Sequence, residues 1–202
     1  MKSLLVLLIT TVTLSGFAAD SKDKLKIGDK ATHTDLEMKD VSGKMVSIDD
    51  VKKDNGVLVL FSSNTCPFVM RWEERYLDAK KWADKNNVGM IVLNSNYHNR
   101  DGVDSFEAMK EKADDKGYNF YYVVDKDSRI ANAYGGQTTP HAFLFNGDGE
   151  LVYKGAIDDN YKSADQVSQA YLKDAIKSLG NGEKVAVTET EPIGCSIKRK
   201  IE

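Results

Sequence analysis

The sequence predicts an α/β fold in which a mixed central sheet is flanked by helices. Two observations carry this prediction. Short continuous apolar runs, typical of strands buried on both faces, alternate along the chain with amphipathic helical patterns. The alternation then ends in two strands around the turn Asn146-Gly147-Asp148-Gly149, which is typical of an antiparallel hairpin.

The first predicted elements lie before residue 95. A hairpin or short strands are expected around Ser42-Gly43, and the apolar runs 57–61 and 89–93 predict buried strands. Between these runs a helical pattern starts at Pro67, with Arg75 on its solvent side. The apolar face of this helix is made by Phe68, Trp72, Tyr76, Ala79 and Ala83.

The second half of the chain continues the alternation. Asp104 and Glu107 form a capping-box pattern at the start of a helix that ends near Gly117. Ser163 and Gln166 give the same pattern for a last helix, which is expected to end at Gly180. The other expected elements are a strand, a short helix and two hairpin strands: 120–124, 128–134, 141–145 and 151–153.

Composition excludes several classes of function. The chain has 202 residues, a net charge of −3 at pH 7 and a pI of about 5.7, which argues against nucleic acid and against a polybasic membrane anchor. Its two cysteines, Cys66 and Cys195, exclude a disulfide-dense scaffold, and the three histidines show no ligand spacing. Neither a metal nor a cofactor is expected.

The N-terminus has the pattern of a secretory signal peptide. Lys2 precedes an apolar run that is too short to cross a bilayer comfortably, and small residues follow. A retained membrane anchor is the alternative. We therefore expect a signal peptide at 1–19, one folded domain at 20–183 and a polar, irregular tail at 184–202. The mature protein is expected in a periplasm or outside the cell, without stable membrane association.

Cys66 lies where a buried strand passes into a helix, with Pro67 suited to the first helical turn. Unpaired backbone N–H groups and the positive end of the helix dipole stabilise an anion at such a position. A thiol there has a pKa below the free value of about 8.5. We interpret Cys66 as a redox thiol, and the alternative is an inert buried cysteine.

Three motifs, in this order and spacing, resemble one family. They are Cys66-Pro67-Phe68-Val69 after a buried strand, Thr139-Pro140 before another, and Gly194-Cys195-Ser196-Ile197-Lys198 in the tail. The sequence resembles the thioredoxin-like redoxins of the alkyl hydroperoxide reductase and thiol-specific antioxidant type. The resemblance implies a thioredoxin-like fold and a thiol-dependent oxidoreductase. It also implies a cis Pro140 beside Cys66.

Further site residues follow from the same resemblance. Pro140 is expected to shape the substrate edge, and Thr65, Pro67 and Thr139 to contact substrate. His141 is expected near Cys66, where an imidazole would stabilise the thiolate or donate a proton. A polar residue that merely starts a strand is the alternative interpretation of His141.

The sequence departs from the family pattern at Ser63. The first cysteine of the family's C-x-x-C-P-F-V motif is Ser63 here, so the usual dithiol is absent from the motif. Ser63 and Cys66-Pro67 also match the spacing of a peroxiredoxin centre, where the hydroxyl orients a peroxide oxygen. Val59 and Pro140, however, stand where peroxiredoxins carry a proline and an arginine.

Cys195 has three open interpretations. As a resolving thiol it would attack an oxidised Cys66 and close an intramolecular disulfide. It could also form a permanent structural disulfide with Cys66, or remain free or pair between chains.

The expected activity is thiol-based oxidoreduction without a cofactor. Cys66 would attack a disulfide or a peroxide and then be resolved by Cys195 or by an external thiol reductant. The partners would be protein or small-molecule thiols and disulfides, or a peroxide. The alternatives are a one-cysteine peroxidase and a non-catalytic module that captures extended polypeptide near Pro140 by backbone pairing.

Overall fold

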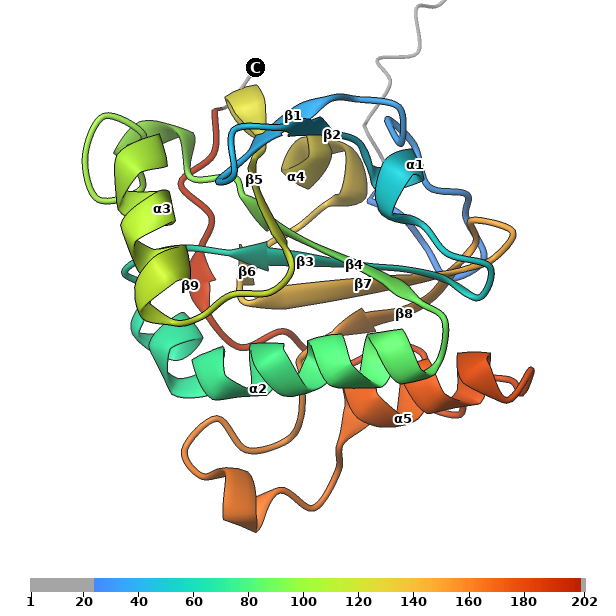
Figure 1. Cartoon of the computed structure of the whole chain (residues 1–202). Helices are drawn as coiled ribbons and strands as arrows, with labels where there is room; N and C mark the ends of the chain where they lie inside the picture. The colour runs from blue at the N-terminus through green and yellow to red at the C-terminus, as the bar shows by residue number, and fades with distance from the viewer. Residues whose placement is uncertain (1–23, 201–202) are drawn as a thin grey trace, which may run out of the picture.

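The computed structural model describes residues 24–200, so the expected signal peptide lies outside the described residues. The main sheet has the strand order β2-β1-β5-β4-β3-β7-β8 (Figure 1). Its central strands β3, β4 and β5 are parallel, and the other pairings are antiparallel. The strands are β1 Met38–Asp40, β2 Met45–Val46, β3 Gly56–Ser62, β4 Gly89–Asn94, β5 Tyr121–Val124, β7 His141–Asn146 and β8 Leu151–Gly155. The predicted mixed sheet is confirmed.

Strand β3 lies at the centre of the sheet and leads into the site. It pairs with β4 on one side and β7 on the other, so that Val59 lies opposite both Ile91 and Phe143. All seven of its residues are buried because helices cover both faces of the sheet. This is why its sequence is a continuous apolar run rather than an alternating one.

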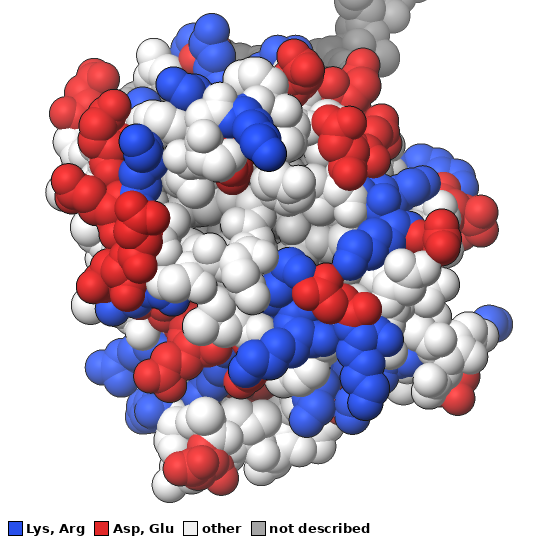
Figure 2. Space-filling view, in the orientation of Figure 1, with Lys and Arg blue, Asp and Glu red and all other residues white. Residues whose placement is uncertain are grey.

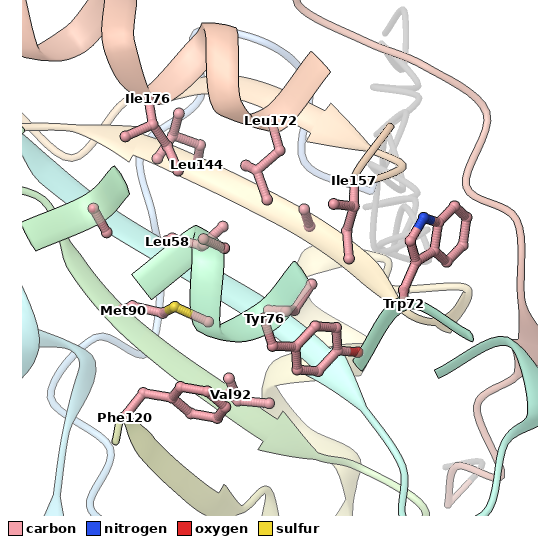
Figure 3. Close-up of a cluster of buried hydrophobic side chains, with 14 of the residues drawn as sticks. Leu58, Trp72, Tyr76, Met90, Val92, Phe120, Leu144, Ile157, Leu172 and Ile176 are labelled. Atoms are coloured by element: carbon pink, nitrogen blue, oxygen red, sulfur yellow. The ribbon is translucent and has the colours of Figure 1, made fainter. Parts of the chain in front are cut away.

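Helices cover both faces of the sheet (Figure 1). The helices α2 (Pro67–Lys85), α3 (Phe106–Asp115) and α5 (Tyr171–Gly180) contribute to one apolar core. The short helices α1 (Ile48–Val51) and α4 (Arg129–Tyr134) contribute to a second core on the other face. Figure 3 shows the first core, which includes Leu58, Trp72, Tyr76, Met90, Val92, Phe120, Leu144, Ile157, Leu172 and Ile176.

One expectation for α2 was wrong, because Arg75 is buried instead of facing solvent. Its guanidinium donates to both carboxylate oxygens of Asp158, at 3.0 and 2.9 Å, and Trp72 Nε1 donates to the same carboxylate at 3.0 Å. Asp158 follows β8 and contacts this side of α2, where Trp72, Arg75 and Asp158 are all buried. The ion pair fixes α2, the helix that carries Cys66 at its start, to the loop after β8.

Two predicted helix starts are displaced. The N-cap of α3 is Ser105, whose hydroxyl accepts from the Ala108 N–H, whereas Asp104 turns into the interior. Ser163 and Gln166 flank only a 3-10 turn, Ala164–Gln166, and α5 begins later, at Tyr171. At α3 the true cap is the residue next to the predicted one, whereas α5 begins after Ala170, which makes no side-chain cap hydrogen bond.

The tail was expected to be irregular, but part of it pairs with the domain. Strand β9 (Cys195–Ser196) pairs antiparallel with β6 (Thr138–Thr139) in a separate two-stranded sheet. We call residues 188–200 the strap. Figure 1 shows the strap in red, with β9 lying beside β6. The polar sequence of the strap does not predict this strand, because the pairing depends on backbone groups and on few side chains.

The surface carries charges of both signs. Figure 2 shows Asp and Glu side chains gathered along the left edge, over α3, and Lys and Arg side chains gathered below the centre, over α2. Within residues 24–200, the structure contains no helix that is both long and apolar enough to cross a membrane.

Candidate active site

Cys66 is the N-cap residue of α2 and is 5% exposed. The chain leaves β3 at Ser62, turns through 63–65 and enters the helix at Pro67, whose missing N–H is not needed in the first turn. The Cys66 thiol donates to the carbonyl oxygen of Thr139 at 3.0 Å. The sulfur is thus held between the start of a helix and the segment that precedes β7.

Asn64 fixes the turn before Cys66 through four hydrogen bonds. Its N–H donates to Asp104 Oδ1 at 2.8 Å, and its side-chain amide donates to the Val103 carbonyl at 2.9 Å. The Tyr122 hydroxyl donates to Asn64 Oδ1 at 2.8 Å, and Lys112 Nζ donates to the Asn64 carbonyl at 2.9 Å. Asn64 was not among the predicted site residues, although its place two residues before the cysteine is the signal that marks it.

Asp104 is the centre of the polar network behind this turn and is fully buried. Besides the Asn64 N–H, its carboxylate accepts from the side-chain amides of Asn94 at 2.7 Å, Asn96 at 2.9 Å and Asn99 at 3.3 Å. A carboxylate with this many donors is stabilised without a salt bridge. The network connects the ends of β3 and β4 and gives the Cys66 turn a rigid support.

Thr139 and Pro140 form the opposite wall of the site. The peptide bond between them is cis, and both residues are buried. Thr139 belongs to β6, and its carbonyl oxygen is the one that accepts from the Cys66 thiol. These two predicted site residues therefore do lie beside Cys66.

The strap brings Cys195 to the same place. In the β6–β9 pairing Thr139 lies opposite Cys195 and Thr138 lies opposite Ser196. Both cysteines are free thiols, and each lies close enough to affect the pKa of the other. Two cysteines far apart in sequence are thus neighbours in the fold.

The two thiols have opposite pKa shifts. Burial acts to raise the pKa of Cys66, but hydrogen bonds from the side chains of Cys195 and Thr139 and from the Val69 N–H outweigh it, so that this pKa is lowered. The pKa of Cys195 is raised to about 11 by burial, by its hydrogen bond to Cys66 and by the negative charge there. Cys66 therefore ionises before Cys195.

Comparison with known proteins places this geometry in a family. The model of the AhpC/TSA family matches residues 27–154. The chain belongs to the AhpC/TSA family. The predicted membership of the thioredoxin-like redoxins is therefore confirmed.

Several individual proteins are similar to this AhpC/TSA chain. The thiol-disulfide oxidoreductase ResA of Bacillus thuringiensis (strain Al Hakam) is 30% identical over 139 residues, which are 68% of this chain and 73% of ResA. An uncharacterized conserved protein of Geobacillus kaustophilus has a TM-score of 0.81 and 30% identity, covering 89% of this chain and 95% of that one. Peroxidoxin BcpB of Mycobacterium tuberculosis shares the fold, with a TM-score of 0.59 at 12% identity, over 78% and 97% of the two chains.

The other predicted site residues of this AhpC/TSA chain near Cys66 differ in their exposure to solvent. Ser63 is buried, and its hydroxyl accepts from the Thr65 N–H at 3.3 Å. Thr65 and Pro67 are exposed and form the outer rim next to the cysteine. Among the described residues, no group of three or more His, Cys, Asp or Glu side chains is placed to hold a metal ion.

His141 does not take the role expected of it. It contacts Phe143, whereas Ala142 and Leu144 belong to the core that contains Cys66, so the imidazole lies on the other face of the sheet. It is buried, and its Nδ1 accepts from the Gln137 N–H at 3.1 Å. Alternation along β7 therefore turns His141 away from the thiol, and it neither stabilises the thiolate nor donates a proton to it.

His141 instead makes stability depend on pH. Burial, helped by the positive charges of Lys154, Lys24 and Arg199, lowers its pKa to about 3. As pH falls from about 6.5 towards 3, the unfolded chain binds a proton at this histidine and the folded chain does not, so stability is lost over that range. His141→Gln, which keeps an acceptor for the Gln137 N–H, is expected to flatten the decline in unfolding free energy between pH 7 and 4.5.

Urea unfolding at several pH values measures this effect. The exposed His98→Gln is the matched control and should leave the wild-type pH dependence unchanged. A decline of the same steepness in His141→Gln and in wild type would show that His141 is not the group responsible.

Proposed function

We propose that this AhpC/TSA-family protein is a thiol–disulfide oxidoreductase whose redox couple consists of Cys66 and Cys195. The observation that carries the proposal is the pairing of β9 with β6, which sets Cys195 opposite Thr139, the residue whose carbonyl accepts from the Cys66 thiol. Ser63 leaves Cys66 without a second cysteine in its own motif. The strap supplies that cysteine from the other end of the domain.

In the first step Cys66 acts as the nucleophile. Its lowered pKa raises the fraction of thiolate above that of an ordinary cysteine, and the thiolate is the reactive form. The thiolate attacks one sulfur of a substrate disulfide, forms a mixed disulfide with it and releases the other sulfur as a thiolate.

In the second step Cys195 resolves the mixed disulfide. It gives its proton to the released thiolate and attacks the Cys66 sulfur, which expels the second substrate thiolate. The substrate disulfide has then gained two electrons, and the protein holds a Cys66–Cys195 disulfide. An external thiol reductant restores the two thiols.

Mass spectrometry with thiol alkylation tests the couple. Oxidised glutathione is expected to remove both free thiols and to produce a linked peptide pair containing Cys66 and Cys195, and dithiothreitol should reverse this. Protein unfolded in urea before alkylation is the control for complete labelling. A Cys66 that stays fully alkylatable, with no linked pair at any oxidant concentration, would contradict the proposal.

Peroxide reduction is the second candidate. It is favoured by the burial of Ser63, three residues before Cys66, and by the burial of Cys66 itself. A hydroperoxide would convert the Cys66 thiolate to a sulfenic acid, and Cys195 would condense with it and release water. Disulfide chemistry is preferred because Val59 and Pro140 stand where peroxiredoxins carry a proline and an arginine. Peroxide consumption by the purified protein separates the two candidates.

The expected substrate contacts are assigned within the same proposal. Thr65 and Pro67, both exposed beside Cys66, are assigned to contact the substrate as it approaches the sulfur. Thr139 orients the thiol through its carbonyl oxygen, and Pro140 holds that carbonyl in place. The alternative of a non-catalytic peptide-binding module is disfavoured because the strap already pairs with the edge near Pro140.

The proposal extends to the location of the protein. We assign residues 1–19 as a cleaved signal peptide, 20–183 as the redoxin domain and 184–202 as the tail, with the mature protein in a periplasm or outside the cell. A cycle that ends in a protein disulfide suits an oxidising compartment. The intact mass measured in the alkylation experiment also reports whether the N-terminal segment has been removed.

A further inference from the structure

We propose that the strap makes Cys66 selective for low-molecular-weight disulfides, because it occupies the strand edge along which a polypeptide substrate would pair. This inference rests on the proposed function and adds the substrate class. The chemistry is the two-step exchange described above, with both substrate sulfurs leaving as small thiols.

The edge in question is β6, next to the Cys66 sulfur. An extended peptide is commonly recognised by adding a strand to such an edge, where backbone groups give affinity. Here the partner strand is β9 of the same chain, paired with Thr138 and Thr139. A protein disulfide approaching Cys66 in extended form meets an edge that is already filled.

The strap is anchored on both sides of Cys195. Upstream, the Thr190 N–H donates to the Lys154 carbonyl and the Lys154 N–H donates to the Thr188 carbonyl, both at 3.0 Å. Downstream, Ile197 is buried in the second core and its N–H donates to the Gln137 carbonyl at 3.1 Å. A competing polypeptide therefore has to release the whole strap and not only the two residues of β9.

The last residues of the strap extend this anchoring across the end of the sheet. The Lys198 N–H donates to Asn96 Oδ1 at 2.8 Å, and the His98 N–H donates to the Lys198 carbonyl at 3.0 Å. The Lys200 N–H donates to Ser128 Oγ at 3.1 Å. These contacts use backbone groups of the strap, so they hold it independently of the redox state of Cys195.

Gly194 is the residue that permits this close packing. A Cβ atom at position 194 would lie 2.3 Å from the Thr139 carbonyl oxygen and 2.7 Å from its carbonyl carbon. The backbone of Thr139 cannot move away easily, because the same carbonyl oxygen accepts a hydrogen bond from the Cys66 thiol. Any side chain at 194 therefore pushes the strap away from β6, and Gly194 is a specificity-determining residue.

The remaining route to Cys66 suits a small molecule. The sulfur-bearing residue is 5% exposed, and the exposed residues Thr65 and Pro67 adjoin it at the start of α2. A low-molecular-weight disulfide needs only one of its sulfurs to reach this opening. A folded protein must bring its backbone alongside β6 to reach the sulfur, and the strap prevents this.

The test compares full-length wild type, Gly194→Ala and the matched control Gly102→Ala, whose added Cβ would meet nothing nearer than the Asn99 carbonyl oxygen at 3.9 Å. The first reaction of Cys66 is followed by mass spectrometry, with oxidised glutathione or insulin as the disulfide. The readout is the rate with insulin divided by the rate with oxidised glutathione. Displacing the strap also changes the pKa of Cys66, and a ratio of two rates of the same thiol is not affected by that change. Wild type and Gly102→Ala should prefer glutathione, and Gly194→Ala should shift the ratio towards insulin by at least about tenfold, since the edge becomes available.

A binding measurement makes the test independent of redox activity. A labelled peptide with the sequence of residues 192–198, carrying serine in place of Cys195, should bind Gly194→Ala and not wild type. Ile197→Ser, which removes a different anchor, should act like Gly194→Ala if the latter folds poorly. An unchanged ratio and no peptide binding in either variant would overturn the inference. If Cys66 of wild type reacts with neither disulfide, the proposed function fails, and peptide binding still decides the role of the strap.

Discussion

Replacement of Cys195 with alanine is expected to abolish repeated turnover while leaving the first reaction of Cys66 intact. Without Cys195 the mixed disulfide on Cys66 has no internal thiol to resolve it, so the multiple-turnover rate should fall by at least about 100-fold. One equivalent of substrate disulfide should still be consumed. Burst kinetics with a small disulfide substrate, together with the intact mass of the trapped adduct, measures both parts.

The same variant should shift the pH profile of Cys66. The side-chain hydrogen bond from Cys195 is one of the contacts that lower the pKa of Cys66, and alanine removes it. The alkylation rate of Cys66 should therefore rise at a higher pH than in wild type. Ser196→Ala, an exposed change in the same strand, is the matched control and should keep both turnover and pH profile. Unimpaired turnover in Cys195→Ala would mean that an external thiol performs the resolution.

Replacement of Asp104 with alanine is expected to cause the largest loss of stability. The carboxylate accepts from the Asn64 N–H and from the side-chain amides of Asn94, Asn96 and Asn99, and alanine would leave these donors without an acceptor. Each buried donor left unpaired costs about 1–3 kcal/mol, with water recovering part of the total. We expect the free energy of unfolding to fall by about 3–5 kcal/mol.

Urea denaturation measures this loss, and disulfide formation at Cys66 measures its functional consequence. Because Asn64 fixes the turn before Cys66, the rate of Cys66–Cys195 disulfide formation should fall even under conditions where the variant stays folded. The exposed Asp101→Ala lies in the same loop and should change stability by less than about 0.5 kcal/mol. If Asp104→Ala and Asp101→Ala are equally stable, the network does not support the turn.

The sequence predicts the centre of the fold well because burial there is complete. The runs at 57–61 and 89–93 become β3 and β4, and Pro67 starts α2 as predicted. Because both faces of these strands are buried, the sequence does not show which face of the sheet a given side chain lies on. In β7 apolar residues occupy both faces, so no polar alternation shows that His141 points away from Cys66.

The sequence pattern does not predict the long-range polar contacts of the site. Asp104 is a residue type that commonly caps helices, but the distant Asn64 N–H and three asparagine side-chain amides hold it in the interior instead. The strap is equally hard to predict from the sequence, since β9 is two residues long and pairs with a strand of two residues. The family motif marked Cys195, but its position beside Cys66 depends on backbone pairing that leaves no periodic trace.

The position of Cys195 late in the chain has a consequence for biosynthesis. Translation at about 5–20 residues per second leaves an interval on the order of ten seconds between the appearance of the two cysteines. During that time Cys66 has no internal partner, and β6 is an open edge that a neighbouring nascent chain can occupy. A chaperone that shields this edge would therefore matter most just before the last strand arrives.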